Sequence, residues 1–128
     1  MRALLDPHTF LWWNTDDPRL SRTAREVIAD GRNEIYLSVA SAWEIAIKAA
    51  RGSLVLPEPP EQYVSSRLQL HRMAVLAIQL RHALHVYDLA MIHRDPFDRL
   101  LIAQSQLEDL PLLTADPEII QYDVTVVW

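Results

Sequence analysis

Four carboxylates occur where the sequence pattern predicts that strands end or helices begin. Asp6 follows a short apolar run, Asp116 follows another, and Asp98 comes two residues after Pro96 at the start of an apolar helical pattern. Glu44 lies inside a further helical pattern. Carboxylates that lie close together cannot all stay ionised without a compensating cation, and oxygen ligands favour Mg²⁺ or Mn²⁺. These residues therefore predict a metal site that could activate water for attack on a phosphate.

Each of these residues also has a structural interpretation. Asp6, Asp95 and Asp116 each precede a proline, and an aspartate before a proline is a good N-cap for a helix. Asp98 would lie in the first turn of its helix, where the helix dipole favours a negative charge. Glu44 is harder to explain, because its sequence neighbours are apolar and an unpartnered buried carboxylate costs several kcal/mol. Capping explains each aspartate alone, but it does not explain why all four carboxylates would converge.

Short apolar runs alternate with helical patterns along the chain. The expected strands are residues 2–5, 34–38, 74–76, 111–114 and 123–128, and the expected helices are about 7–14, 21–30, 39–51, 60–71, 79–90 and 96–107. Ser38 or Ser41 would cap the third helix, and Gly31 and Gly52 would follow helix ends. This alternation predicts one α/β domain over residues 1–128, with a central, mostly parallel sheet of four to five short strands flanked by helices.

Topology suggests where the carboxylates meet. Ligands of an open parallel sheet bind at the carboxyl ends of its strands, where Asp6 and Asp116 are expected. Asp98 and Glu44 would lie near helix N-termini, which connectivity places at the same edge. Other kinds of site are excluded, because a chain with no cysteine and two glycines has no thiolate metal site, nucleophilic thiol, glycine-rich phosphate loop or G-x-S-x-G elbow.

Charge and hydropathy limit the partners and the location. A net charge of −5 argues mildly against nucleic acid, although a cluster of acids rimmed by arginines would give the same sum. All Lys and Arg positions except Lys48 are arginine. Arg94 and Arg99 are the candidates for phosphate contact, with an ordinary solvated or ion-paired arginine as the alternative. No apolar segment approaches the roughly 20 residues of a membrane span, and no secretory pattern opens the chain. We therefore expect a cytoplasmic protein without a membrane partner.

Aromatic residues and histidines could contribute to the same site. Trp12 and Trp13 could stack bases, although aromatic side chains more often serve a core or a partner interface. His8 lies two residues after Asp6, and a surface or hydrogen-bonded role suits it better than metal ligation. His93 could orient a carboxylate, but we do not expect it to be a metal ligand.

Four segments resemble, in order and spacing, the motifs of PIN-domain proteins, specifically the VapC-type toxins of bacterial and archaeal toxin–antitoxin pairs. They are residues 4–12 (LLDPHTFLW), 41–48 (SAWEIAIK), 93–104 (HRDPFDRLLIAQ) and 113–117 (LTADP). The likeness covers essentially the whole chain. It implies a compact α/β/α domain, a Mg²⁺- or Mn²⁺-dependent endoribonuclease that cleaves RNA as a toxin, inhibition by a small cognate antitoxin, and a homodimer or higher assembly.

The resemblance also implies roles for individual residues. By motif position, the acidic residues of the family correspond to Asp6, Glu44, Asp98 and Asp116. The three aspartates would ligate the metal, and Glu44 would complete the site or position the attacking water. Asp95 is an additional acid with a capping or secondary role. Thr114 fits a position where the family often has a hydroxyl that assists the site.

One departure from the family pattern keeps a second function open. Threonine is common after the first aspartate in this group, whereas this chain has Pro7. Together with the acidic net charge, this leaves the alternative of a catalytically weak or inactive PIN-like module that binds RNA or a protein. A third option, an aspartate-nucleophile phosphotransfer enzyme, usually needs a D-x-D arrangement that Asp6-Pro7-His8 does not provide.

Overall fold

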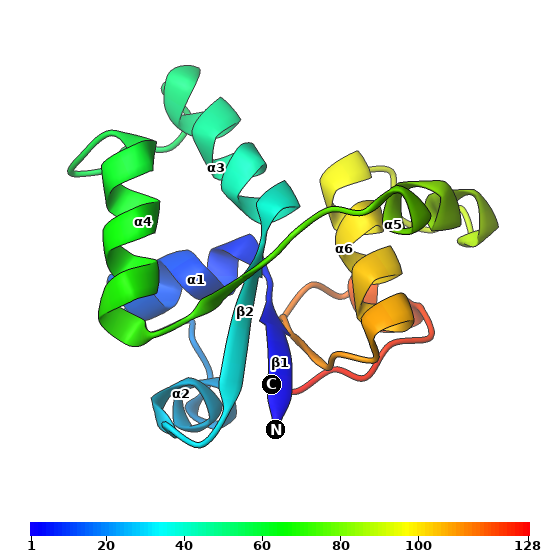
Figure 1. Ribbon diagram of the computed structural model, residues 1–128, viewed down its shortest axis with the longest axis horizontal. Coiled ribbons are helices and arrows are strands. Elements are labelled where there is room, and N and C mark those ends of the chain that lie inside the picture. The colour runs from blue at the N-terminus through cyan, green and yellow to red at the C-terminus, as the bar shows by residue number, and fades with distance from the viewer.

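The computed structural model describes residues 1–128 and contains a four-stranded parallel sheet with helices on both faces (Figure 1). The strands are β1 (Arg2–Leu5), β2 (Glu34–Ser38), β3 (Ala74–Leu76) and β4 (Leu112–Leu113), in the spatial order β3-β2-β1-β4. Central strand β1 sets Leu4 opposite Tyr36 of β2 and Leu5 opposite Leu113 of β4. The predicted α/β fold with a parallel sheet of four to five strands is confirmed.

Six α-helices and two short 3-10 helices surround the sheet. They are α1 (Pro7–Asn14), α2 (Arg22–Ala29), α3 (Val39–Ala50), α4 (Pro60–His71), α5 (Leu80–His85), η1 (Val86–Asp88), α6 (Pro96–Glu108) and η2 (Ile119–Gln121). Figure 1 shows α1, α2 and α4 to one side of the strands and α5 and α6 to the other. None of the helices combines the length and the apolar character that crossing a bilayer requires.

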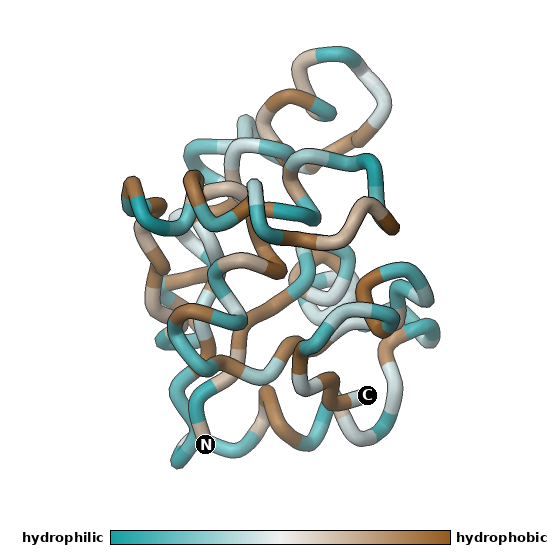
Figure 2. Tube along the Cα trace, turned by 90° about the vertical axis from the view of Figure 1, so that its right-hand side faces the viewer, coloured by the Kyte–Doolittle hydropathy of each residue, from teal (hydrophilic) through white to brown (hydrophobic).

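Strand β1 is buried on both faces and divides the core into two layers. Ala3 and Leu5 pack into the cluster on the side of α1 to α4, whereas Leu4 packs with Leu101 and Ile102 of α6 on the other side. A strand buried on both faces has a continuous apolar sequence, which is why residues 3–5 show no polar alternation. The trace in Figure 2 alternates between hydrophilic and hydrophobic residues along its outer segments, as expected for helices with one buried side.

Three local predictions were wrong. Residues 123–128 form only one isolated bridge, from Leu112 to Val126, because β4 is two residues long and offers little edge for pairing. The segment predicted as a helix over 79–90 is the six-residue α5 followed by the 3-10 turn η1. Gly31 does not take the left-handed conformation of a helix-ending glycine, whereas Gly52 after α3 does, with φ of 76°.

Candidate active site

Asp6 both caps a helix and points into the site. It follows β1 directly, and its Oδ1 accepts a hydrogen bond of 2.8 Å from the backbone N–H of His8 at the start of α1. Its Oδ2 accepts a hydrogen bond of 2.7 Å from the hydroxyl of Thr114, which follows β4. The Thr114 oxygen in turn accepts the backbone N–H of Asp116 at 3.1 Å. The paired strand ends thus hold Asp6, Thr114 and Asp116 together, as topology predicted.

The two aspartates at the start of α6 make different contacts. Asp95 caps the helix, because its Oδ1 accepts hydrogen bonds from the backbone N–H groups of Phe97 at 2.8 Å and Asp98 at 3.4 Å. Asp98 makes no capping contact, and its Oδ2 lies 2.9 Å from Nε2 of His93. Asp98 is therefore the carboxylate of this motif that is free to act in the site.

His93 contacts two of the carboxylates at once, whereas its sequence position predicted only that it could orient one. Its Nε2 lies 2.9 Å from Asp98 Oδ2 and 3.1 Å from Asp116 Oδ2. The backbone N–H of Asp95 lies 3.1 Å from Nδ1 of His93, and Nε2 is the ring nitrogen between the two acids. Nδ1 also lies 3.2 Å from Glu118. The only signal in the sequence was that His93 lies within the same motif as Asp95 and Asp98.

Glu44 is buried on α3 with one oxygen left unpaired. Its Oε2 lies 2.7 Å from Nζ of Lys48, and its Oε1 has no hydrogen-bond partner although it is buried. The i,i+4 spacing of Glu44 and Lys48 is a sequence signal for such an ion pair. Glu44 lies close enough to Asp95 and Asp98 for one oxygen from each to fall within 4.8 Å of the others.

The site divides into two potential metal-binding groups that share one residue. One group is Glu44, Asp95 and Asp98, and the other is His93, Asp98 and Asp116. Burial and then the negative charges of Asp6, Asp95 and Glu44 raise the pKa of Asp98 to about 7. A carboxylate held at such a pKa beside other acids would be stabilised by a cation, and Glu44 Oε1 offers an unused oxygen ligand. The donor set therefore fits a hard divalent ion.

The same electrostatics predict that the metal-free protein loses stability as the pH rises. The pKa of Asp98 is raised from its usual 3.8, so the folded state binds the Asp98 proton more tightly than the unfolded chain does. Burial lowers the pKa of His93, but its hydrogen bond to Asp116 and the charges of Asp98 and Asp116 outweigh burial and raise it overall. The stabilisation from Asp98 is therefore lost as the pH rises from 3.8 to about 7, and that from His93 is lost as the pH rises above 6.5 through its raised pKa.

We expect the free energy of unfolding in EDTA to fall between pH 5.5 and pH 8, by on the order of 1–2 kcal/mol from these two groups. Urea denaturation at both pH values measures the difference. Mg²⁺ or Mn²⁺ should raise the unfolding temperature more at pH 8 than at pH 5.5. The Asp98→Asn variant should show a flatter pH profile, and an identical profile for the two proteins would contradict this assignment.

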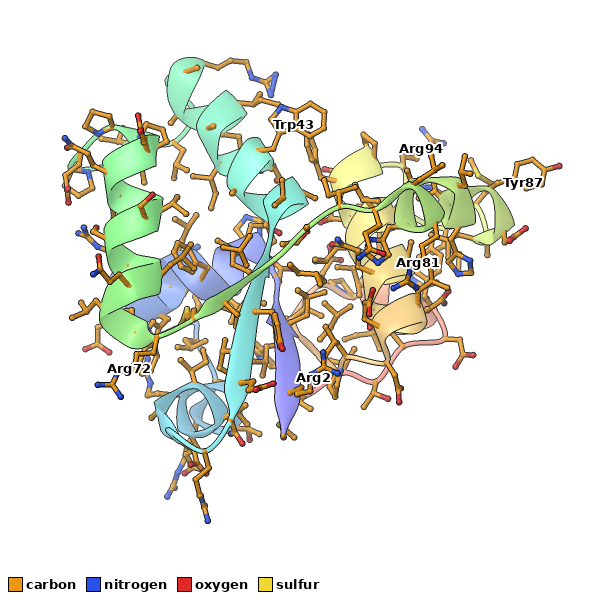
Figure 3. All side chains as sticks on the ribbon, viewed as in Figure 1. Arg2, Trp43, Arg72, Arg81, Tyr87 and Arg94 are labelled. Carbon is orange, nitrogen blue, oxygen red and sulfur yellow. The ribbon has the colours of Figure 1, made fainter.

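The two candidate phosphate-binding arginines differ in exposure. Arg94 is exposed, and Figure 3 shows its side chain at the outer edge of the molecule beside α5 and α6. Arg99 is buried, and its guanidinium donates to the backbone carbonyls of Val86 at 3.0 Å and Ala90 at 2.8 Å. The prediction that Arg99 contacts phosphate was wrong, because protein acceptors already occupy its donors.

Comparison with known proteins gives the family. The family model for the PIN domain matches residues 3–124. The chain is 42% identical over 72 residues to Ribonuclease VapC16 of Mycobacterium tuberculosis (strain ATCC 25618 / H37Rv), a match that covers 53% of this chain and 51% of that protein. The chain thus spans about half the length of this curated relative.

A solved structure shares the fold. The crystal structure of VapBC2 from Rickettsia felis bound to a DNA fragment from their promoter contains a chain that superposes with a TM-score of 0.71 at 13% identity, over 98% of this chain and 96% of that one. At this identity the match supports the fold alone. The PIN-domain match over residues 3–124 covers nearly the whole sequence, and the chain therefore belongs to the PIN-domain family.

Proposed function

We propose that the protein is a Mg²⁺- or Mn²⁺-dependent endoribonuclease that acts as the toxin of a toxin–antitoxin pair. What supports this proposal is the position of Asp98, which belongs to both potential metal-binding groups and whose pKa is raised to about 7 by burial and by the charges of Asp6, Asp95 and Glu44. The likeness to Ribonuclease VapC16 supports RNA as the substrate. Cytoplasmic RNA is the expected target.

Asp6, Asp98 and Asp116 would hold the metal ion, and Glu44 would complete the site. The bound ion would supply an activated water for in-line attack and would stabilise charge on the phosphate. Thr114 orients Asp6 through the 2.7 Å hydrogen bond to Oδ2. The unpaired Oε1 of Glu44 is available to orient the attacking water or to accept its proton.

Pro7 does not leave the site without a hydroxyl. It is the first residue of α1, a position where proline is favourable because the backbone N–H is not needed. The hydroxyl that contacts Asp6 comes from Thr114. The departure at residue 7 is therefore compatible with an active enzyme.

A cognate antitoxin and self-association belong to the same proposal. Several large apolar side chains along α5 and the turn after it are exposed, namely Leu80, Leu84, Tyr87 and Met91. Exposed apolar clusters of this kind are typical of surfaces that bind another protein. A small antitoxin and a second copy of the chain are the partners we propose.

The Asp6→Asn variant tests the nuclease proposal. We expect cleavage of cellular RNA with Mg²⁺ or Mn²⁺, no cleavage in EDTA, and a loss on the order of 10²- to 10³-fold in the variant, because one charged ligand is removed. Asparagine is also a good N-cap, so it can still accept the His8 N–H, and circular dichroism should show an intact fold. Unchanged cleavage by Asp6→Asn would sink the proposal. Wild-type protein that binds RNA but cuts none with Mn²⁺ would instead favour the non-enzymatic module.

A further inference from the structure

A pocket of about 300 Å³ opens next to the carboxylate cluster on the side of α1. Asp6 and Asp116 form its boundary with the site, and Trp12, Arg19 and His8 line it further out. The proposed chemistry uses the two aspartates but none of the other three side chains. Its volume is at the lower end of the range for small-ligand sites, which suits a single nucleotide unit.

Trp12 and Arg19 present a layered, flat surface to this pocket. The Arg19 guanidinium carbon lies 4.9 Å from the centre of the Trp12 ring. Asp17 holds the guanidinium in place through bonds of 3.0 Å to Nε and 2.8 Å to Nη2, and no protein group hydrogen-bonds to Nη1. Trp12 is further packed against Trp128, with ring centres 6.0 Å apart. The indole is therefore held in position while it remains only partly buried.

The ligand that best fits this arrangement is one base of a single-stranded RNA. Proteins recognise unpaired bases by stacking them on aromatic rings and on arginine planes, and the pocket offers both. A base is uncharged, so it can lie beside the acidic boundary formed by Asp6 and Asp116. An RNA whose phosphate is positioned at those acids would bring the neighbouring base to the adjoining pocket. A protein side chain would also fit into the pocket, but the proposed RNA cleavage at Asp6 and Asp116 brings an RNA base beside it.

We propose that Trp12 and Arg19 form a subsite that stacks one base next to the phosphate to be cleaved. This subsite rests on the proposed function, since it needs RNA at the carboxylate cluster. It assigns to Trp12 and Arg19 the preference of the enzyme for the nucleotide on one side of the cut.

Binding to RNA without cleavage tests the subsite. The protein carries Asp98→Asn in all samples, and the anisotropy of a fluorescein-labelled single-stranded RNA of about ten nucleotides reports the Kd in Mg²⁺. Trp12→Leu should weaken binding about tenfold, and Trp12→Phe, which keeps a ring, should recover most of the loss. Arg19→Gln should weaken binding severalfold, because it removes the guanidinium over the Trp12 ring while the contact of Trp12 with Trp128 is kept. Arg32→Gln is the matched control, because Arg32 is exposed and pairs with Asp30 as Arg19 pairs with Asp17, yet it does not line the pocket, so this variant should bind RNA as before.

RNAs with a single abasic nucleotide separate the loss of one stacked base from a general weakening of RNA binding. With Trp12 present, the abasic change should weaken binding most at one position next to the cleaved bond, and in Trp12→Leu this position should lose its special effect. Equal binding by Trp12→Leu and its parent would overturn the subsite. So would a Trp12→Leu protein that binds RNA normally but escapes inhibition by a cognate antitoxin.

The two proposals fail separately. If the wild-type protein cuts no RNA with Mg²⁺ or Mn²⁺ while the abasic effect depends on Trp12, the nuclease assignment falls and the pocket is a base-binding site without a cleavage role. If Asp6→Asn abolishes cleavage while Trp12→Leu changes neither Kd nor the abasic profile, the nuclease stands and the subsite falls. Unfolding temperatures of the Trp12 and Arg19 variants, measured in parallel, identify any loss of RNA binding that comes from misfolding. If Trp12→Leu is misfolded, the RNA binding of Trp12→Phe, which keeps an aromatic ring, decides the outcome.

Discussion

Replacing Asp98 with asparagine is expected to abolish RNA cleavage and, at the same time, to stabilise the metal-free protein. Asp98 belongs to both potential metal-binding groups, so its loss should lower kcat on the order of 10³-fold. Burial and the charges of Asp6, Asp95 and Glu44 raise the pKa of Asp98 to about 7, so its ionised form is costly when no cation is bound. Neutral asparagine avoids that cost, and the free energy of unfolding in EDTA at pH 8 should rise by about 1 kcal/mol.

Two measurements check this opposite effect on activity and stability. Single-turnover cleavage gives the rate, and urea denaturation in EDTA gives the free energy of unfolding. Asp123→Asn is the control, because Asp123 is exposed and away from the cluster. Its cleavage rate should match that of wild type, and its free energy of unfolding should stay within about 0.5 kcal/mol of wild type. An Asp98→Asn protein that is inactive and also clearly less stable would mean that Asp98 acts as a structural residue at the start of α6.

The parts of the fold that depend on local sequence could be predicted. Residues 2–5 read as a buried strand because three consecutive apolar residues follow Arg2, and Asp6 before Pro7 read as the N-cap of the next helix. Parallel connectivity then placed Asp6 and Asp116 at one edge, where Thr114 links them. The predicted capping role of Asp95 agrees with its hydrogen bond from the backbone N–H of Phe97, whereas Asp98 contacts His93 in the site.

The parts that depend on tertiary packing could not be predicted. His93 lies in an irregular segment, so no periodicity indicated that its ring would bridge Asp98 and Asp116. Arg99 looked like a surface residue beside an acidic motif, yet its helix turns it inward against the chain around η1. Strand pairing at residues 123–128 failed because it depends on how long the partner strand β4 is, which the β-branched pattern does not encode.

Replacing Arg99 with methionine is expected to destabilise the protein by about 3 kcal/mol or more. The buried guanidinium donates to the carbonyls of Val86 and Ala90 and lies 3.2 Å from the hydroxyl of Tyr122, so it joins α6 to the segment that precedes the site. Methionine fills a similar length but removes these donors, so the carbonyl of Ala90 keeps only the Tyr122 hydroxyl and that of Val86 only the backbone N–H of Leu89. Arg94→Met, five residues earlier and exposed, is the matched control and should change the free energy of unfolding by less than about 0.5 kcal/mol.

Arg99 should also control the position of His93. The Tyr122 hydroxyl that contacts Arg99 accepts the backbone N–H of His93 at 2.8 Å, so loss of the guanidinium should loosen the residues that carry the bridging ring. Hydrogen exchange in Arg99→Met should therefore accelerate over residues 86–93 before it accelerates in β1. Arg99→Lys keeps the charge but loses the forked donors, and we expect an intermediate loss of stability. If Arg99→Met unfolded like wild type and lost only RNA cleavage, Arg99 would be a substrate contact after all, and the inward hydrogen bonds would not be its function.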